Sequence, residues 1–562
     1  MNKVELKKEL KDLKKRNEAP AWMGTLSYSK LYSLLKKQNL TPKGRYKLIA
    51  KTAASYLPED QMEWEDKFFN MLWKGWLAPS TPVMSNLGTD NGMAVSCSAS
   101  YVGDSMWDIS YTGHEVEMLS KYGFGTAAFL DVREGYSPIS TGGITNPTKD
   151  WVEKFYKSQN WVSQGSQRRG SCAIYMDFWH GDLLEILAML KTYDKLHMGI
   201  ICDDSVKEAL NKQDPEALKR MTTILTWRAK KGKPYIIFID NARRQDPEYY
   251  KDLGLSSKQS NLCTEIFLHT DSDHTLSCVL SSLNLSLFDE WKDTDTVYNA
   301  TVFLDCIAED LIQRGSKIKG LERVVRSTVK GRALGLGALG YHTYLQQNMI
   351  PFDSFQARMK NTELFKHIHD ESLRASKFLA SWLGEPEWCK GTGLRNTHRT
   401  AIAPNTTSAF VVGAKSQGIE PFAANVFNQK LDHIGTVERI NPVLLDLMKQ
   451  KGIYTPELIS KIALNKGSIQ GLDEFNDLEK EVFKTAYEIN QKAIIDYAEH
   501  RQKYICQGQS LNLFFSATED EEWIKEVHKY AFEKDLLKSL YYVRMQAGIQ
   551  ADKGDECVAC EG

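Results

Sequence analysis

The sequence predicts an α/β protein, and three observations support this prediction. Short apolar or β-rich runs such as GTAAFLDV, SCAIYMDF and KPYIIFID alternate with helical stretches such as GDLLEILAMLKTY over a long middle region. The chain of 562 residues can bury a large core, and 42% apolar with 25% charged residues is ordinary for a globular protein. A formal net charge of −1 gives no global field that favours nucleic acid or an anionic membrane.

Helical patterns flank this middle region. SKLYSLLKKQ and WEDKFFNMLWKGWL place apolar and aromatic residues at helical spacing near the N-terminus, and similar patterns return after about residue 430. The last dozen residues are rich in Gly, Asp and Lys, which predicts a mobile tail. We therefore expect a helical region over 1–75, a large α/β unit with helical additions over 76–545, and a flexible tail over 546–562.

Composition also bears on location. No run of ~18 apolar residues is long enough to span a membrane, and the basic N-terminus, MNKVELKKELKDLKKRNEAP, lacks the apolar stretch of a signal peptide. Ten cysteines without a secretory signal indicate the cytoplasm, where a cysteine pair is more often catalytic or metal-binding than structural.

Two motifs mimic functional sites. Gly335, Gly337 and Gly340 have the spacing of a dinucleotide-binding loop, but the charged, glycine-interrupted segment LERVVRSTVKGRA precedes them where a strand is needed. We expect these glycines to allow close helix packing instead. His367 and His369 lie two residues apart, so on a helix they face different sides and are not expected to form a metal pair.

The last six residues contain two cysteines, Cys557 and Cys560, in the polar segment DKGDECVACEG. A zinc site would need a second C-x-x-C or a histidine pair, and the other eight cysteines are solitary. The pair therefore calls for a different explanation, which depends on the remaining cysteines.

An unusual thiol lies in QSNLCTEI. Asn261, Cys263 and Glu265 alternate, so in an extended segment they would project to one side. A core cysteine would have apolar neighbours at those positions, whereas this thiol is flanked by an amide and a carboxylate.

Further motifs follow one another along the chain: PSTPVMSN, VSCSASYVGDS with Cys97, SQGSQRRGS, LSCVLSSLNLS with Cys278, APNTTSAF followed by GIEP, and the tyrosines of SLYYVRMQ. Together with NLCTE and the terminal C-x-x-C, this series resembles the large (α) subunit of class I ribonucleotide reductase from about residue 75 onward. That family reduces ribonucleoside diphosphates to deoxyribonucleotides by radical chemistry. The resemblance implies a ten-stranded α/β barrel with the central thiol on a finger loop threaded through it.

The resemblance also implies residue roles. Cys263 would be the thiyl radical that takes the 3′ hydrogen of the ribose, Glu265 would accept the 3′-hydroxyl proton, and Asn261 would hydrogen-bond the sugar. Cys97 and Cys278 would supply two reducing equivalents as the 2′-hydroxyl leaves as water, and would end as a disulfide.

Two further pairs of residues would connect the site with partner proteins. Cys557 and Cys560 would reduce the buried disulfide by thiol exchange and would themselves be reduced by a thioredoxin or glutaredoxin-type protein. Tyr541 and Tyr542 would relay the radical from a small (β) subunit that carries a metal-based radical cofactor. The chain itself would then need no metal or cofactor.

The nucleotide contacts follow from the same resemblance. In APNTTSAF a proline precedes a helix start whose N–H groups suit a diphosphate, although a plain capping sequence is an alternative. The implied substrate-binding residues are Thr81, Ser96, Gly123, Asn405, Thr406, Thr407 and Ser408. A specificity site for dNTP or ATP effectors would use Asp104 and Arg133, and Arg168 or Arg169 would carry its signal to the substrate.

Many large subunits begin with an extra nucleotide-binding cone that mediates inhibition by dATP. Only about 75 residues precede LAPSTP here, and they lack the basic, glycine-containing signature of that cone. We therefore expect a compact form, class Ib-like or phage-type, without inhibition through such a cone. A homodimer is also expected, because effector binding in this family usually accompanies dimerisation.

Three alternatives remain at this stage. A cobalamin-dependent reductase of the same superfamily would work without a partner subunit. A dithiol oxidoreductase acting on other proteins would explain the terminal pair but not Asn261, Glu265 or the tyrosines. A non-catalytic nucleotide-binding relative would not need the full set of cysteines.

Overall fold

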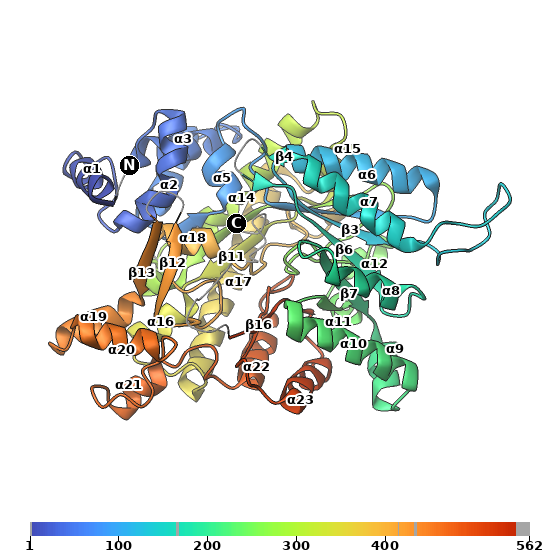
Figure 1. The fold of residues 1–562 in the computed structure, drawn as a ribbon. Helices are drawn as coiled ribbons and strands as arrows, with labels where there is room; N and C mark the ends of the chain where they lie inside the picture. Colours follow the sequence, from blue (N-terminus) through green and yellow to red (C-terminus); the bar gives the residue numbers. More distant parts are fainter. Residues whose placement is uncertain (1–2, 165–167, 414, 432–434, 547–562) are drawn as a thin grey trace.

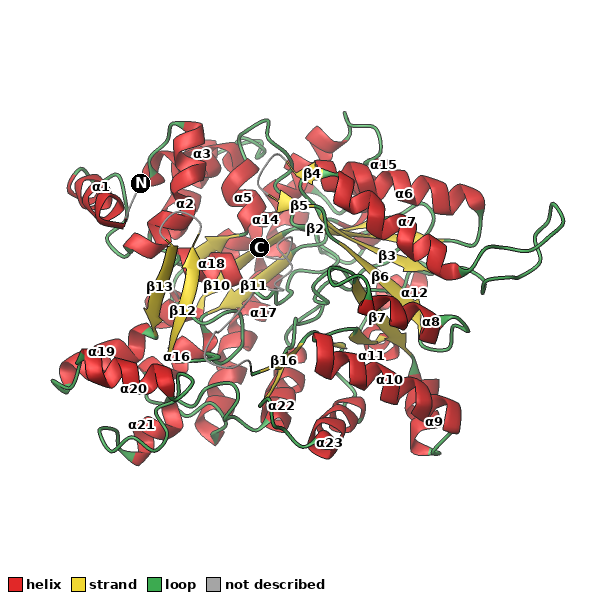
Figure 2. Ribbon diagram, viewed as in Figure 1, coloured by secondary structure: helices red, strands yellow, loops and turns green. Residues whose placement is uncertain are grey.

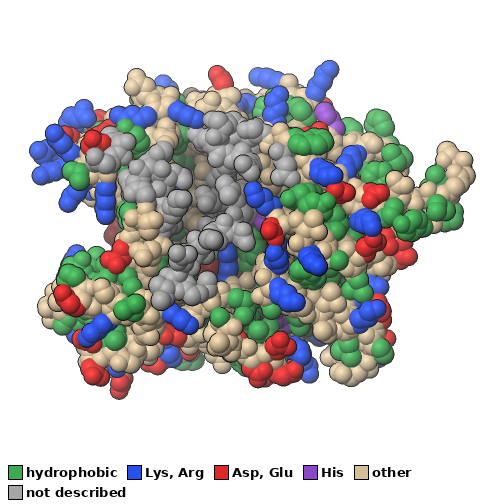
Figure 3. Space-filling view, viewed as in Figure 1, with side chains coloured by type: hydrophobic (Ala, Val, Ile, Leu, Met, Phe, Trp, Pro, Cys, Tyr) green, Lys and Arg blue, Asp and Glu red, His purple; other side chains and the backbone are tan. Residues whose placement is uncertain are grey.

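The computed structural model describes residues 3–164, 168–413, 415–431 and 435–546, and it has the predicted α/β architecture. Two β-sheets lie at the centre with helices around them (Figure 1, Figure 2). On the face drawn in Figure 3, basic and acidic side chains are interspersed over much of the surface. Within the described part of the chain, no helix combines the length and apolar character needed to cross a bilayer.

The N-terminal region is helical, as predicted. Leu6, Leu10 and Leu13 form the buried face of the first helix. Thr41 caps the third helix by accepting a hydrogen bond from the Gly44 N–H. The elements are α1 (Lys3–Lys15), α2 (Thr25–Gln38), α3 (Pro42–Ala54), α4 (Gln61–Trp73), β1 (Leu77–Pro79) and α5 (Thr81–Asn86).

The larger sheet has seven strands in the order β15-β8-β7-β6-β3-β2-β9. The five central strands are parallel, whereas β9 and β15 pair antiparallel at the two edges. The strands are β2 (Cys97–Val102), β3 (Gly125–Leu130), β6 (Cys172–Asp177), β7 (His197–Cys202), β8 (Tyr235–Phe238), β9 (Leu276–Cys278) and β15 (Ser539–Leu540). Their near-complete burial on both faces is typical of parallel sheets covered by helices.

Helices and a small hairpin connect these strands. They are α6 (Met106–Lys121), α7 (Thr148–Trp161), β4 (Ser163–Gln164), β5 (Arg168–Arg169), α8 (Leu183–Ala188), α9 (Asp204–Asn211), α10 (Pro215–Lys231), α11 (Ile239–Arg244) and α12 (Glu248–Asp252). The runs that the sequence analysis assigned to alternating strands and helices are confirmed.

The smaller sheet has three strands, and with the larger sheet it supplies the ten strands that the family resemblance implies. Its strands are β1, β10 (Leu280–Asn284) and β11 (Gly335–Leu339). Only Val279 separates β9 from β10, so the two sheets are joined directly in the chain. The following helices are α13 (Phe288–Trp291), α14 (Thr296–Gly315), α15 (Glu322–Gly331), α16 (Tyr341–Gln347), α17 (Phe355–Leu383) and α18 (Thr406–Val411).

The expectation for the glycine motif was wrong in part. Gly335 and Gly337 lie in strand β11, not in a helix contact. A Cβ on Gly337 would come within 2.7 Å of the Ala401 carbonyl oxygen, so the glycine allows a close backbone approach inside the sheet. The same strand assignment excludes a dinucleotide loop at this position.

The segment between α12 and β9 forms the predicted finger loop. Residues 259–268 are buried although they form neither helix nor strand. Leu262, Cys263, Ile266 and Phe267 pack in one apolar cluster with inward side chains of β2, β3, β6, β7, β8 and β9. A buried loop must find partners for its backbone groups, and this requirement shapes the site below.

The C-terminal part is mostly helical with a few short strands. Its elements are β12 (Val426–Leu431), β13 (Gly435–Ile440), α19 (Pro442–Gln450), α20 (Pro456–Leu464), α21 (Asp477–Val482), α22 (Gln491–Gln502), β14 (Leu513–Phe515), α23 (Glu521–Phe532) and β16 (Val543–Met545). Tyr541 and Tyr542 lie between β15 and β16.

Candidate active site

The thiol of the finger loop lies on a tight turn. The Asn261 Oδ1 accepts hydrogen bonds from the backbone N–H groups of Glu265 and Ile266, both at 3.1 Å, and Thr264 has φ of +67°. The expectation of an extended segment with alternating side chains was therefore wrong. The turn, held by the Asn261 amide, is what brings Asn261 and Glu265 together around Cys263.

Contacts from the C-terminal part of the chain hold this turn in place. The Ser510 hydroxyl donates to the Cys263 carbonyl at 2.6 Å and lies 3.3 Å from Glu265 Oε2. The Ser539 hydroxyl donates to the Thr264 carbonyl at 2.9 Å. Because these serines come from the segment that leads to the tyrosine pair, the position of Cys263 depends on that segment.

Cys97 and Cys278 are brought opposite each other. They are directly paired residues of the antiparallel strands β2 and β9, and both are buried, reduced thiols. Directly paired residues in antiparallel strands have Cα atoms ~4.5–5.5 Å apart, which lies inside the range that a disulfide needs. Burial and then the neighbouring Cys97 raise the pKa of Cys278 well above its ordinary value, so this thiol stays protonated at neutral pH.

Glu265 is a buried carboxyl with a strongly shifted pKa. The Asn261 Nδ2 donates to Glu265 Oε1 at 2.9 Å, and the residue is 1% exposed. Burial, followed by the nearby Cys97 thiol, raises the pKa of Glu265 to about 8, against the smaller opposing effect of its hydrogen bonds. Such a group can exchange a proton with a substrate near neutral pH.

A pH dependence follows from this shift. At neutral pH the raised pKa keeps Glu265 mostly neutral, so the base form grows as the pH rises through about 8. We expect kcat/KM for nucleotide reduction to rise with pH with a midpoint near 8, and Glu265→Gln to lose both activity and this rising limb. A wild-type profile that is flat over about pH 7 to 9 would show that Glu265 is not the base.

The two predicted relay tyrosines contact each other in the core, with their rings tilted by 59°. The rings of Tyr541 and Tyr542 lie 4.3 Å apart between centroids, with 2% and 4% exposure. They belong to the same apolar cluster as Cys97, Cys263 and Cys278. The fold therefore places the aromatic pair beside the cysteines, as a relay would require.

A third tyrosine and a histidine join this pair, and the sequence analysis missed both. The ring of Tyr235 on β8 lies 4.7 Å from that of Tyr541, and its hydroxyl donates to the Tyr542 hydroxyl at 2.9 Å. The His197 Nδ1 on β7 lies 2.9 Å from the Tyr235 hydroxyl and 3.2 Å from that of Tyr542. These residues stand in separate apolar strands, and only the sheet order brings them together.

Part of the predicted substrate set lines one cavity. Thr81 on α5 and Thr407 and Ser408 on α18 border a cavity of about 90 Å³. The Asn405 side chain is fully engaged, since its Nδ2 donates to the Ala338 and Ala403 carbonyls and its Oδ1 accepts from two hydroxyls. Asn405 therefore shapes the loop, whereas Thr406 begins α18, as the sequence predicts.

The other two predicted substrate residues lie near the cysteine pair. The Ser96 N–H donates to the Cys278 carbonyl at 3.3 Å, and the Ser96 carbonyl accepts from Gly125 N–H at 2.8 Å. Gly123 follows α6 with φ of +100°, just before β3. Both residues thus adjoin the strands β2 and β3.

Two of the predicted effector residues, Asp104 and Arg133, form an ion pair. Arg133 Nε lies 2.7 Å from Asp104 Oδ2, and its backbone N–H donates to Oδ1 at 3.1 Å, with both side chains about 40% exposed. The backbones of Arg168 and Arg169 form β5, paired with β4, but their side chains lie outside what the structure describes. Cys557 and Cys560 also fall outside the described residues.

Comparisons with known proteins agree with this fold. Residues 95–215, 202–391 and 380–543 match the model of the ribonucleotide reductase barrel domain, and residues 23–92 match its all-alpha domain. The chain thus belongs to the ribonucleotide reductase family, and within it to the large subunits.

Individual relatives point to the same subunit. The chain is 35% identical over 533 residues to a large-subunit relative from Frog virus 3 (isolate Goorha), covering 89% of this chain and 93% of the relative. It is 30% identical to the ribonucleoside-diphosphate reductase large subunit of Invertebrate iridescent virus 3, covering 94% and 96%.

A solved structure, the class Id ribonucleotide reductase α subunit of Actinobacillus ureae, superposes with a TM-score of 0.86 at 36% identity, covering 94% of this chain and 98% of that chain. The resemblance to class I is confirmed, and the cobalamin-dependent alternative is not favoured. The class Ib-like or phage-type subgroup stays a prediction.

Proposed function

We propose that this chain is the catalytic subunit of a ribonucleoside-diphosphate reductase and that Cys263, Cys97 and Cys278 carry its chemistry. The observation that best supports this assignment is the pairing of Cys97 with Cys278 in one apolar cluster with Cys263. A dithiol oxidoreductase acting on proteins would need only the terminal pair, and it would leave the buried cluster of Cys97, Cys263 and Cys278 without a role.

The first step is hydrogen transfer. A sulfur radical on Cys263 takes the 3′ hydrogen of the ribose, which leaves the unpaired electron on the sugar and regenerates the S–H bond. Glu265 accepts the 3′-hydroxyl proton, and its raised pKa suits a group that must take and return a proton. Asn261 holds Glu265 by a hydrogen bond of 2.9 Å, and we expect its amide to hydrogen-bond the sugar as well.

The second step removes the 2′-hydroxyl. One thiol of the Cys97–Cys278 pair protonates the leaving hydroxyl, which departs as water. The two cysteines together give up two electrons and two protons as their S–S bond forms, and the sugar gains a C2′–H bond. Cys263 then returns hydrogen to C3′ and becomes the radical again. The paired register on β2 and β9 lets the disulfide form without large movement of the backbone.

The radical must come from elsewhere. Tyr541 and Tyr542 carry it to Cys263 from a small (β) subunit that holds a metal-based radical cofactor. Tyr235 and His197 support the pair through the hydrogen bonds described above. The diphosphate is held at the start of α18, dNTP or ATP effectors bind near Asp104 and Arg133, and the chain works as a homodimer in the cytoplasm.

The proposal is tested by ribonucleoside diphosphate reduction with and without a candidate small subunit, using a thioredoxin or glutaredoxin-type reductant. Deoxyribonucleotide should form only when both subunits are present. Reduction by the chain and cobalamin alone would instead identify a cobalamin-dependent enzyme, and nucleotide binding without reduction under either condition would identify a non-catalytic relative.

The terminal cysteines give a further prediction. Because Cys97 and Cys278 are buried, a protein reductant cannot reach their disulfide directly, and the terminal thiol pair would have to reduce it by exchange. The variant Cys557→Ser/Cys560→Ser should complete about one turnover after pre-reduction and then stall with the protein reductant. A small dithiol that reaches the Cys97–Cys278 disulfide should partly restore turnover. Undiminished multiple turnover with the protein reductant would exclude the shuttle role.

Regulation can be tested separately. A bound dNTP should change the relative affinity for different substrate diphosphates by roughly 5–150-fold, which corresponds to a coupling of ~1–3 kcal/mol. Arg133→Ala should reduce this change, whereas Arg374→Ala, which breaks a similarly exposed ion pair with Asp295, should not. Equilibrium binding of each diphosphate with and without each dNTP is the measurement. Identical preferences under all conditions would show that this site is vestigial.

A further inference from the structure

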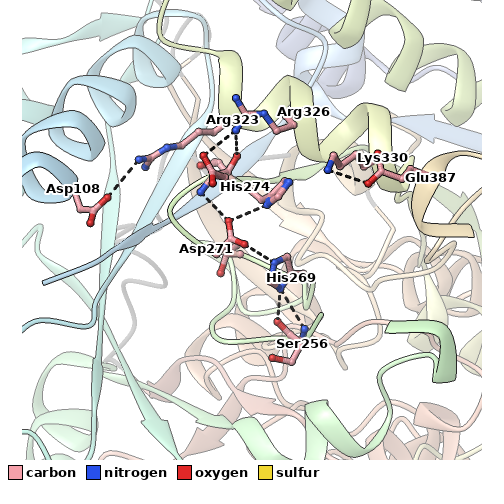
Figure 4. Close-up of polar contacts among 12 residues, drawn as sticks. Asp108, Ser256, His269, Asp271, His274, Arg323, Arg326, Lys330 and Glu387 are labelled. Atoms are coloured by element: carbon pink, nitrogen blue, oxygen red, sulfur yellow. Dashed lines mark hydrogen bonds and ion pairs between the residues drawn. The ribbon is translucent and has the colours of Figure 1, made fainter. Parts of the chain in front are cut away.

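A second polar cluster lies between the finger loop and β9, outside the site described above. His269, Asp271 and His274 belong to a short hairpin in which Asp271 and His274 pair through a double backbone hydrogen bond. Figure 4 shows both imidazole rings directed at the Asp271 carboxylate. His269 Nε2 lies 2.9 Å from Asp271 Oδ2, and His274 Nδ1 lies 2.9 Å from Asp271 Oδ1.

We propose that His269, Asp271 and His274 bind one divalent transition-metal ion of the zinc class. Their three ligand atoms lie within 4.8 Å of one another, which allows them to surround a single ion after small side-chain rotations. Two imidazoles and one carboxylate are a donor set that zinc accepts, with a fourth position left for water. The same set is too nitrogen-rich for magnesium or calcium, which prefer all-oxygen ligands.

The surroundings suit a metal ligand on His269. Its Nδ1 lies 3.3 Å from the Ser256 carbonyl oxygen and 3.2 Å from the Ser256 N–H. When Nε2 binds a metal, Nδ1 carries the proton and can donate it to the carbonyl, which is the usual second contact of a ligating histidine. When the metal is absent, the N–H of Ser256 can donate to Nδ1 instead. The same backbone position therefore serves both tautomers.

The Asp271 carboxylate is also oriented by a neighbouring backbone group, as is usual for a metal ligand. The Asp273 N–H donates to its Oδ1 at 2.8 Å, a contact that orients the carboxylate.

The cluster is enclosed on its apolar side, and nearby basic groups have partners of their own. The Trp388 ring lies 5.9 Å from His269 and 5.2 Å from His274, which limits access of water. Arg326 pairs with Asp273 at 3.0 Å. Lys330 pairs with Glu387 at 3.0 Å, as Figure 4 shows. An ion here would fix the hairpin that links the segment carrying Cys263 to the strand carrying Cys278.

The sequence predicted no metal in this chain because the small subunit would supply the radical cofactor, and the only metal motifs considered were cysteine pairs and histidines on one helix face. The spacing in HTDSDH is typical of neither, and the hairpin turn is what brings the three side chains together. Metal binding at this hairpin does not depend on the reductase reaction.

Zinc and cobalt titrations test the site. The full-length Cys557→Ser/Cys560→Ser chain, which lacks the terminal thiol pair, is stripped with a chelator and titrated with Zn²⁺ by calorimetry and with Co²⁺ by absorption spectroscopy. One equivalent of each ion should bind, and the cobalt spectrum should show d–d bands without a thiolate charge-transfer band. His269→Asn and His274→Asn should weaken binding at least about tenfold. His367→Asn, which alters a half-buried histidine on α17, should leave it unchanged.

Equal affinity in the His269→Asn variant and its parent, or the absence of saturable binding in the parent, would overturn the proposal. The three residues would then form a metal-free hydrogen-bonded cluster. If His269→Asn or His274→Asn fails to melt cooperatively in the absence of metal, Asp271→Asn provides the same test with a side chain of nearly equal shape. Thiolate bands in the cobalt spectrum would place the ion on cysteines and would also overturn it.

Discussion

Replacement of Cys263 by serine is expected to abolish nucleotide reduction while substrate binding stays nearly intact. Serine has almost the same shape, but its O–H bond is too strong for the hydroxyl to form and hold the required radical. The loss should exceed about a hundredfold in kcat, equivalent to at least ~2.7 kcal/mol of transition-state stabilisation. Steady-state reduction and equilibrium binding of a ribonucleoside diphosphate measure the two effects.

Cys306→Ser is a matched control for this change. Both cysteines are 2% exposed, but Cys306 lies on α14 in a different apolar cluster. It should tolerate the hydroxyl with some loss of stability and little loss of kcat. Retention of even a tenth of wild-type turnover by Cys263→Ser would remove Cys263 from the central role.

The second large effect is expected at the tyrosines. Phenylalanine at position 542 preserves the ring packing but removes the hydroxyl that contacts Tyr235 and His197. Without that O–H group the ring cannot lose a proton and an electron together, so radical transfer should stop. We expect Tyr542→Phe to lower kcat more than about a hundredfold without changing KM for the substrate. Steady-state kinetics with a small subunit provide the measurement.

Tyr341→Phe separates this effect from simple destabilisation. Tyr341 is also buried, its hydroxyl donates to the Ala357 carbonyl at 3.2 Å, and it belongs to a different apolar cluster from Cys97, Cys263 and Cys278. Its loss should cost about 1–3 kcal/mol of stability and leave kcat largely unchanged. If the two variants retained similar activity, Tyr542 would be a packing residue and the relay would run elsewhere.

Most of the α/β fold could be predicted from the sequence, because the strands and helices in the middle of the chain have clear and different apolar patterns. The sequence also indicated the three thiols that the fold gathers in one apolar cluster, because their motifs occur in a recognisable order. The register that sets Cys97 opposite Cys278 depends on strands far apart in the chain, and nothing local encodes it.

Local conformation around the thiol was harder to predict. Thr264 adopts a positive φ that threonine rarely takes, and the turn exists because the Asn261 amide and the Ser510 and Ser539 hydroxyls hold it. The contacts of Tyr235 and His197 with the tyrosine pair could not be predicted either, since in the sequence each is an ordinary residue of an apolar strand. In each case tertiary contacts decided the outcome.

The most direct test of the account is a single-turnover experiment on the reduced Cys557→Ser/Cys560→Ser chain with its small subunit and one ribonucleoside diphosphate. Deoxyribonucleotide is quantified, and disulfides are mapped by peptide mass spectrometry after rapid alkylation. The account predicts one Cys97–Cys278 disulfide for each deoxyribonucleotide formed, with Cys263 recovered as a thiol. Deoxyribonucleotide formed while Cys97 and Cys278 both remain reduced would contradict it.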